Sequence, residues 1–338
     1  MKSAYSALAL GALLLGACEG LRSQRQAMGE PTSLIVVATD SLWKEAGDRV
    51  EAALEPKIFA VRDETTFELT QVSPTSPDWS QLQRFRQIVA IGTATDPWIA
   101  PILEGSSESE AAPRMVDRND VWARGQTVTA VVLPSPDALD ALGTQLGRLG
   151  TLLDTRFRQY ALARMFASDS NVVLRDSLSR RVGFSITLPK IYQPMEPADT
   201  VLAFHNRNEV GGDLFRTIVV AWHGGVDTTL TAADVLAWRD RLVPLVFDLA
   251  QRTLADRFES KPVDGAAAGS LEVRGVWAGT DPSFPTGGLF IDRVIPCREQ
   301  DRTYFLEAWM YGPSRRKYEY VLQFENILGS FRCHAATG

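Results

Sequence analysis

Few side chains in this sequence stand in the patterns that catalysis or metal binding requires. The three histidines, His205, His223 and His334, show neither HExxH nor His-x-His spacing and predict no metal site. Asp117 and Asp120 could meet as a carboxylate pair for acid–base chemistry, but their charged and polar neighbours favour a solvated turn. The sequence has no Gly-x-Ser-x-Gly elbow and no phosphate-binding loop. We therefore predict no catalytic residue, no metal ligand and no cofactor.

The N-terminal residues predict another chemistry, the covalent attachment of lipid. Lys2, a short apolar run over residues 7–15 and small residues before Cys18 follow the order of a secretory signal peptide, residues 1–17. The apolar run is much shorter than the ~20 residues of a membrane-spanning helix.

The run Leu15-Gly16-Ala17-Cys18 resembles a bacterial lipobox. The resemblance implies cleavage before Cys18 and lipidation of Cys18, with chains such as palmitate holding the protein on a membrane. Glu19 differs from the aspartate usually linked to inner-membrane retention, which favours the outer membrane of a Gram-negative-type bacterium. A soluble secreted protein with an ordinary cleavage site is the alternative.

Two further thiols remain, Cys297 and Cys333. Exported compartments are oxidising, so we predict a disulfide bond between them. In the chain-entropy estimate, closing a loop of that length stabilises the fold by about 4 kcal/mol. Two buried free thiols are the alternative. Isolated cysteines lack the CxxC spacing of a metal site.

Tryptophans and their polar neighbours are the remaining candidates for binding. Trp122, Arg124 and Gln126 form a polar–aromatic cluster in a loop before a predicted strand, where α/β layers expose binding groups. We treat these three residues as a possible binding surface. Three other tryptophans fall in predicted strands of the second half, namely Trp222, Trp277 and Trp309. Aromatic platforms bind sugars or peptides, but we prefer core packing for them.

Length and composition limit the class of protein. A chain of 338 residues with 45% apolar and 22% charged side chains predicts a folded protein of two domains. The net charge is −6 and no tract of five or more basic residues occurs. We therefore expect no binding to nucleic acid, which needs clustered Lys and Arg.

The first half is predicted to be an α/β domain over residues 33–168, after a flexible tether over residues 18–32. Short apolar runs typical of buried strands alternate with helical patterns, which indicates a mixed or parallel sheet with helices. The longest helix is predicted from about Pro136 to Phe166. Three glycines on it, at positions 143, 147 and 150, predict close packing on its own sheet, and a groove for a partner is the alternative.

The polar residues 169–181 predict a linker, and residues 182–334 an α+β domain. Its first strand is predicted at Val182–Leu188, where apolar and polar side chains alternate. The pattern continues with two strands, a helix, three strands and a last helix from about Arg315. This order is typical of an antiparallel sheet flanked by helices.

Two resemblances support this architecture. The run Val182–Pro189 and the run Phe324–Phe331 make the second half similar to the PsbP-like fold, which implies an antiparallel sheet flanked by helices. The whole mature chain resembles an uncharacterised bacterial lipoprotein family, domain of unknown function 4837. Its carriers are the lipobox, Val72-Ser73-Pro74, Trp79, Phe85-Arg86-Gln87-Ile88, Trp122-Ala123-Arg124-Gly125-Gln126 and Gly183-Phe184-Ser185. That resemblance implies no known activity.

The sequence favours a lipid-anchored cell-envelope protein without catalytic activity that binds an envelope partner. An envelope hydrolase acting on a polar substrate is one alternative. A carrier of a small hydrophobic ligand is the other. A pocket that gathers Asp or Glu with His would favour the hydrolase, a dry tunnel the carrier, and a flat apolar patch the binding protein.

Overall fold

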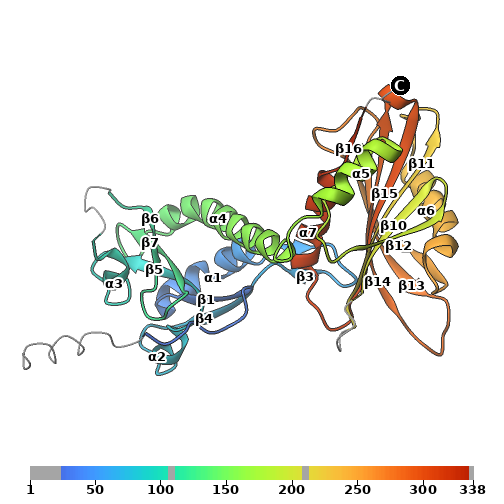
Figure 1. Cartoon of the computed structure of the whole chain (residues 1–338). Coiled ribbons are helices and arrows are strands. Elements are labelled where there is room, and N and C mark those ends of the chain that lie inside the picture. Colours follow the sequence, from blue (N-terminus) through green and yellow to red (C-terminus); the bar gives the residue numbers. More distant parts are fainter. Residues whose placement is uncertain (1–23, 106–110, 208–212, 335–338) are drawn as a thin grey trace, which may run out of the picture. The chain divides into compact units, whose positions relative to one another are not determined.

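A computed structural model of the chain describes residues 24–105, 111–207 and 213–334 (Figure 1). These residues form two compact units. Unit 1 contains the described residues up to Pro56 and Phe67–Thr151, and unit 2 contains Lys57–Thr66 and the described residues from Leu152 onward. The predicted signal peptide and Cys18 lie outside the described residues. Among the described helices, none has both the length and the apolar character needed to span a bilayer.

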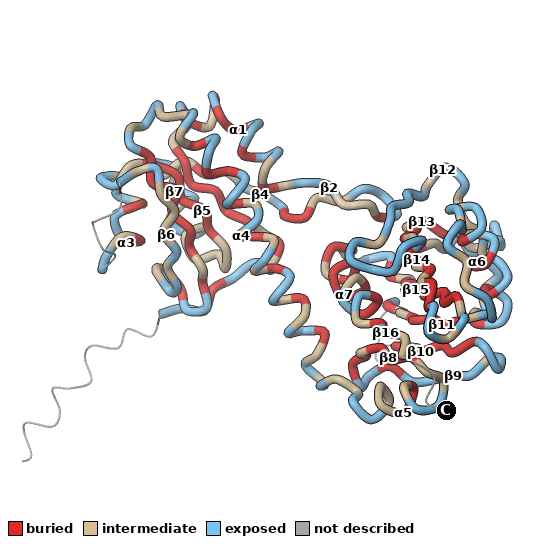
Figure 2. The backbone as a smooth tube through the Cα atoms, turned by 90° about the horizontal axis from the view of Figure 1, so that it is seen from above, coloured by how far each residue is buried: buried red, intermediate tan, exposed pale blue. Residues whose placement is uncertain are grey.

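Unit 1 is built on a mixed sheet of five strands. In spatial order they are β4 (Glu68–Val72), β1 (Ser33–Val37), β5 (Gln87–Thr93), β7 (Thr127–Leu133) and β6 (Arg114–Asn119). The first four are parallel, and β6 pairs antiparallel with β7. The centres of β1, β5 and β7 are buried, as Figure 2 shows. Their continuous apolar runs follow from this burial on both faces, which confirms the predicted α/β class.

Helices α1 (Asp40–Leu54), α2 (Trp79–Leu82), α3 (Ala100–Leu103) and the first part of α4 (Leu139–Met165) complete unit 1. The side chain of Thr39 caps α1 by accepting a hydrogen bond from the Leu42 N–H. Gly150 of α4 is required by close packing, because a Cβ there would lie 2.8 Å from the Ala53 carbonyl oxygen of α1. No such contact exists at Gly147. The close approach is therefore to a helix and not to the sheet.

The predicted domain boundary is wrong. The division falls between Thr151 and Leu152, and the predicted linker 169–181 contains helix α5 (Val172–Val182) of unit 2. Asn171 caps this helix by accepting a hydrogen bond from the Leu174 N–H, and Gly183 ends it with φ of 83°. The sequence did not indicate helix α5, because most of its side chains are polar and lie at the surface, and only Leu178 is buried.

Unit 2 is built on an antiparallel sheet of seven strands. In spatial order they are β12 (Gln251–Pro262), β13 (Leu271–Gly279), β14 (Gly287–Cys297), β15 (Arg302–Tyr311), β11 (Phe215–Gly224), β10 (Val201–Arg207) and β9 (Gln193–Ala198). The short pairs β2 (Lys57–Ile58) with β3 (Glu64–Thr65) and β8 (Phe184–Ser185) with β16 (Arg332–Cys333) stand outside this sheet, and a single 3-10 turn, η1 (Arg298–Gln300), precedes β15.

Neighbouring strand residues point to opposite sides of the sheet, so both faces carry apolar side chains, and a helix covers each face. Helix α6 (Ala232–Val246) packs on Val219 and Phe305, whereas α7 (Tyr318–Gly329) packs on the other face with Ile218 and Leu306. The side chain of Thr231 caps the start of α6 in a capping box with Asp234. The predicted α+β class is confirmed.

Two details of the predicted sheet are wrong. The alternating run Val182–Leu188 forms only the two-residue strand β8, which pairs with β16. The alternation arises because Phe184, Ile186 and Leu188 are buried in the same core as α7, and it does not reflect a place in the large sheet. The edge strands β9 and β12 were not predicted, because their side chains are mostly exposed and carry no apolar alternation.

Candidate ligand-binding pocket

The polar–aromatic cluster that we predicted as a possible binding surface is part of the packing of unit 1. Gln126 is buried. Its amide donates hydrogen bonds to the carbonyl oxygens of Gln83 and Phe85 at 2.7 and 2.6 Å. Its carbonyl oxygen accepts one from the Trp122 backbone N–H at 3.0 Å. All polar groups of this amide are therefore used within the fold.

The other two members of that cluster behave in the same way. The Trp122 ring packs edge-on against Trp79 with centroids 5.3 Å apart. Arg124 is exposed, and its Nε donates to Gln26 Oε1 at 3.2 Å. The structure brings the three predicted residues together, but it uses them to hold the loop and the N-terminal segment of unit 1.

The candidate acid–base groups are also held by their neighbours. Asp117 accepts a hydrogen bond from Thr129 Oγ1 at 2.7 Å, and Asp120 accepts one from the Gly125 N–H at 2.5 Å. Each carboxylate thus has a separate structural partner.

Among the histidines, His223 packs its ring on Trp238, with centroids 4.7 Å apart.

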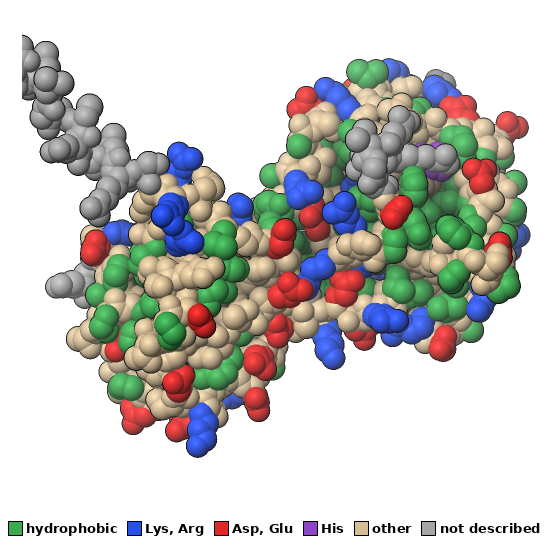
Figure 3. Space-filling model, turned by 90° about the horizontal axis from the view of Figure 1, so that it is seen from below, with side chains coloured by type: hydrophobic (Ala, Val, Ile, Leu, Met, Phe, Trp, Pro, Cys, Tyr) green, Lys and Arg blue, Asp and Glu red, His purple; other side chains and the backbone are tan. Residues whose placement is uncertain are grey.

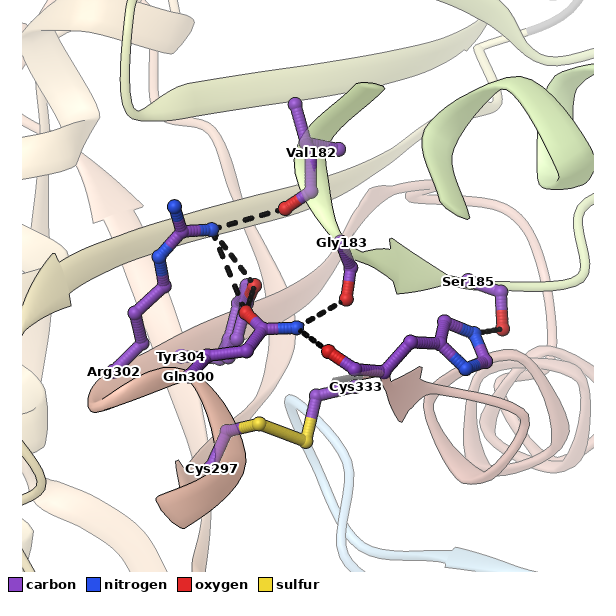
Figure 4. The surroundings of a disulfide bond; sticks show 9 residues. Val182, Gly183, Ser185, Cys297, Gln300, Arg302, Tyr304 and Cys333 are labelled. Carbon is purple, nitrogen blue, oxygen red and sulfur yellow. Dashed lines mark hydrogen bonds between the residues drawn. A yellow bond between two sulfur atoms is a disulfide. The ribbon is translucent and has the colours of Figure 1, made fainter. Parts of the chain in front are cut away.

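The predicted disulfide joins Cys297 to Cys333 in unit 2 (Figure 4). Gln300 lies beside it and donates to the carbonyl oxygen of His334. The His334 ring nitrogen Nε2 lies 2.9 Å from Ser185 Oγ. The disulfide and these contacts fix β16 and place His334 in a structural role.

A cavity of about 410 Å³ lies in unit 2, within the usual range for a small-molecule site. Its lining is mostly aromatic and aliphatic, with a few polar side chains: His205, Asp213, Phe215, Thr217, Val246, Phe247, Asp248, Leu249, Trp277, Phe284, Thr286, Trp309 and Tyr311. Figure 3 shows hydrophobic side chains gathered on one face of unit 2. This cavity is the best candidate for a functional site.

The aromatic wall of the cavity is a stack built from neighbouring strands. Trp277 of β13 and Trp309 of β15 lie nearly parallel with centroids 4.9 Å apart, and Phe247 contacts Trp309 at 4.7 Å. Gly288 of the intervening strand β14 makes this possible, because a Cβ there would lie 2.7 Å from the Trp277 ring nitrogen. The Trp277 indole therefore lies flat across a strand that has no side chain at that point.

The indole N–H groups of the wall are already used. Trp277 Nε1 donates to the Met310 carbonyl oxygen at 3.2 Å, and Trp309 Nε1 donates to Gln251 Oε1 at 3.0 Å. The same Gln251 oxygen accepts from Arg239 Nη2 at 2.8 Å. The wall thus presents ring carbon atoms to the cavity.

Below the wall lies a cluster of buried charges. The fully buried Arg239 donates from Nε to Glu307 Oε1 at 2.9 Å and lies 4.2 Å from the ring centre of Phe290. Asp292 of β14 stands opposite Glu307 of β15, and neither of its oxygens has a hydrogen-bond partner among the described residues. Burial is the main effect that raises the pKa of Asp292 well above its usual value, and repulsion by Glu307 raises it further. The attraction of Arg239 acts in the opposite direction.

Burial also raises the pKa of Glu307, and Arg239 opposes that effect. One guanidinium therefore faces two buried carboxyl groups. Because Glu307 holds the hydrogen bond from Arg239 and Asp292 does not, we expect Asp292 to keep its proton over the wider pH range.

Polar groups reach the cavity at its side and at its rim. His205 Nδ1 lies 2.9 Å from Thr217 Oγ1. We call the exposed lining residues Asp213, Asp248 and Phe284 the rim. No Lys or Arg belongs to the described residues that line the cavity.

Sequence reasoning found part of this site. For Trp277 and Trp309 the sequence suggested either core packing, which we preferred, or an aromatic binding platform. In the structure each of the two is a buried core residue that also lines the cavity. Trp222 lines no part of the cavity and packs on Phe184 with centroids 6.1 Å apart. Phe215 and Phe247 were not singled out as a site, because their strands and helix end meet only in the folded sheet. The Gly287-Gly288 pair, which faces a tryptophan across the sheet, was the signal that could have indicated a flat aromatic wall.

Within the described parts of the chain, no group of three or more His, Cys, Asp or Glu side chains could hold a metal ion.

Solved structures with similar folds share little sequence with this chain. The Saccharomyces cerevisiae Ran-binding protein Mog1p is 14% identical over 46% of this chain and 92% of its own, with a TM-score of 0.33. The PsbP protein (CyanoP) of Synechocystis is 10% identical over 45% and 87%, with a TM-score of 0.30. A protein of Bacteroides thetaiotaomicron is 9% identical over 46% and 47%, with a TM-score of 0.21.

Two family models match the chain, one in each half, and no curated protein matches it. The resemblance to domain of unknown function 4837 is confirmed over the second half. The first half, which we expected to carry the same resemblance, matches another model. Residues 27–147 match the family described as Domain of unknown function (DUF8532), and residues 171–330 match the family described as Domain of unknown function (DUF4837).

Proposed function

We propose that this protein is a lipid-anchored component of the bacterial cell envelope that binds its partner without chemical turnover, and that the aromatic cavity of unit 2 is the binding site. The lipobox at Cys18 supports the anchor and the outer-membrane location. The single observation that supports binding is the cavity itself, whose aromatic lining is built on the stacked rings of Trp277 and Trp309.

The chemistry of the wall supports recognition of an apolar or aromatic group. Both indole N–H groups are engaged inside the protein, so a ligand gains little by offering acceptors to the wall. It gains instead by covering aromatic surface, at about 25 cal/mol for each Å² removed from water. A small aromatic molecule, or an aromatic group displayed by an envelope partner, meets that requirement.

Calorimetric titration tests the proposal. The full chain in lipid nanodiscs is titrated with small aromatic compounds that are neutral, cationic or anionic, and empty nanodiscs serve as the blank. We expect at least one compound to bind, and Phe284→Ala to weaken its binding without unfolding the protein, since Phe284 is 63% exposed. Phe258→Ala is the matched control, because Phe258 is 39% exposed and does not line the cavity. Binding of no compound, or an equal effect of the two variants, would contradict the proposal.

One observation supports the hydrolase as a second candidate. The cavity gathers His205 with Asp213 and Asp248, and His205 contacts the hydroxyl of Thr217 at 2.9 Å. A histidine can take the proton of such a hydroxyl and activate it as a nucleophile. However, Thr217 is only 3% exposed near the start of β11, so substrate has poor access to its oxygen.

The two candidates separate in an assay of ester and amide hydrolysis. A hydrolase requires turnover that Thr217→Val abolishes while the aromatic ligand still binds. The binding protein predicts no turnover by the wild type under conditions in which ligand binding is measurable.

A further inference from the structure

We propose that the ligand of the aromatic cavity is a small amphiphilic cation, an ammonium or amine group carried on an apolar or aromatic body. This inference rests on the proposed function and adds the charge of the ligand. The observation that carries it is the joint presence of an aromatic wall and an acidic rim, with no Lys or Arg among the described lining residues.

The wall suits a cation for an electrostatic reason. The face of an aromatic ring carries negative potential, and a cation within about 6 Å of the ring centre is attracted to it. The lining rings that are partly or fully exposed are Phe215, Phe247, Phe284 and Tyr311, whereas Trp277 is fully buried and Trp309 is 7% exposed behind them. Phe215 and Tyr311 lie stacked with centroids 6.1 Å apart and extend the aromatic surface beyond the two indoles.

The rim provides the second contribution. Asp213 and Asp248 line the cavity and are exposed, so a ligand that enters passes carboxylate groups. A carboxylate attracts an ammonium group and repels a phosphate or carboxylate ligand. The net charge of −6 acts in the same direction at longer range.

The buried interior provides the third contribution that favours a cationic ligand. Arg239, whose hydrogen bond to Gln251 brings it close to the wall, is fully buried and also donates to Glu307 and Thr253. It does not line the cavity and offers no hydrogen bond to an anionic ligand there. Cationic ligands are therefore favoured over both neutral and anionic ones of the same shape.

A pair of isosteric probes tests the charge directly. Benzyltrimethylammonium and its uncharged carbon isostere, neopentylbenzene, are titrated into the full chain in nanodiscs, with benzylphosphonate as the anionic counterpart. We expect the cation to bind about three- to thirtyfold more tightly than the isostere, and the anion to bind most weakly. Cation binding should weaken as salt rises, and isostere binding should not.

Two variants assign the effect to the rim. Asp213→Asn should weaken cation binding by about two- to fivefold and leave isostere binding unchanged. The double variant Asp213→Asn/Asp248→Asn should weaken it further. Asp256→Asn is the matched control, because this exposed aspartate of β12 does not line the cavity.

The outcomes distinguish this inference from the proposed function. Equal affinity for cation and isostere, or an equal effect of Asp213→Asn and Asp256→Asn, overturns the inference and leaves the aromatic binding site standing. Tighter binding of benzylphosphonate than of the cation also overturns it. Failure of all three probes to bind overturns the proposed function together with the inference.

Discussion

Replacing Arg239 by methionine should destabilise unit 2 by about 3–5 kcal/mol, the usual cost of removing one partner of a buried ion pair. The reason lies in three fully buried side chains. Arg239 is the counter-charge for Glu307, and it also lowers the cost of burying Asp292. Without it, two facing carboxyl groups remain in the core with no cation. Glu307→Gln should cost less, because Asp292 can then lose its proton and become the partner of Arg239.

A double-mutant cycle separates the charge effect from lost packing. Arg239→Met/Glu307→Met removes both charges and keeps apolar volume, so it should recover at least about 2 kcal/mol of the loss. Because a chain of two compact units need not unfold in one step, stability is best measured by hydrogen exchange of β14 and β15 in a urea series. A cost below about 1 kcal/mol for Arg239→Met, or a double variant no more stable than the single one, would refute the reasoning.

The same cluster predicts a dependence on pH. Burial and Glu307 raise the pKa of Asp292 in the folded protein above its unfolded value of 3.8. The contribution of Asp292 to stability is therefore complete below pH 3.8 and is lost as pH rises through the folded-state pKa. Asp292→Asn removes this loss, so the difference in unfolding free energy should move in favour of the variant as pH rises. A difference that does not change with pH would contradict the raised pKa.

Three further changes have definite expected outcomes. Gln126→Leu should destabilise unit 1 by about 3 kcal/mol in urea denaturation, because it leaves two carbonyl groups and one N–H unpaired, whereas Arg124→Ala at the exposed position should cost about 0.5 kcal/mol or less. Equal costs would mean that the amide is not a packing element. Cys297→Ala, or Cys333→Ala, should cost about 4 kcal/mol in thermal or urea unfolding, given the sequence separation of 36 residues, and a reducing agent should reproduce that loss in the wild type. Cys18→Ser should abolish incorporation of a labelled fatty acid and release the protein from the membrane fraction; a variant that stays labelled and membrane-bound would refute the proposed anchor.

Several features followed from local sequence with little ambiguity. The short apolar runs of the first half, such as that of β1, predicted strands buried on both faces, because this pattern depends on residues within a few positions of one another. Pairing of Cys297 with Cys333 followed from there being only two thiols beyond Cys18.

Other features depended on neighbours that are distant in the chain. Gln126 looked like an exposed binding group, but its partners are carbonyl groups some forty residues earlier, at Gln83 and Phe85. Helix α5 looked like a linker because only Leu178 in it is fully buried. A polar side chain in a loop has the same local pattern whether it faces water or an unpaired carbonyl group.

The sequence by itself determined the α/β and α+β classes of the two halves and the disulfide partners, because each depends on short-range patterns or on residue type. Only the tertiary structure decided the cavity. Its wall forms because β13 and β15 flank β14 at Gly288, which has no side chain. Its rim forms because the end of α6 lies beside β11. Strand order and the meeting of distant side chains depend on which faces bury most apolar surface in the whole unit, and no window of sequence contains that information.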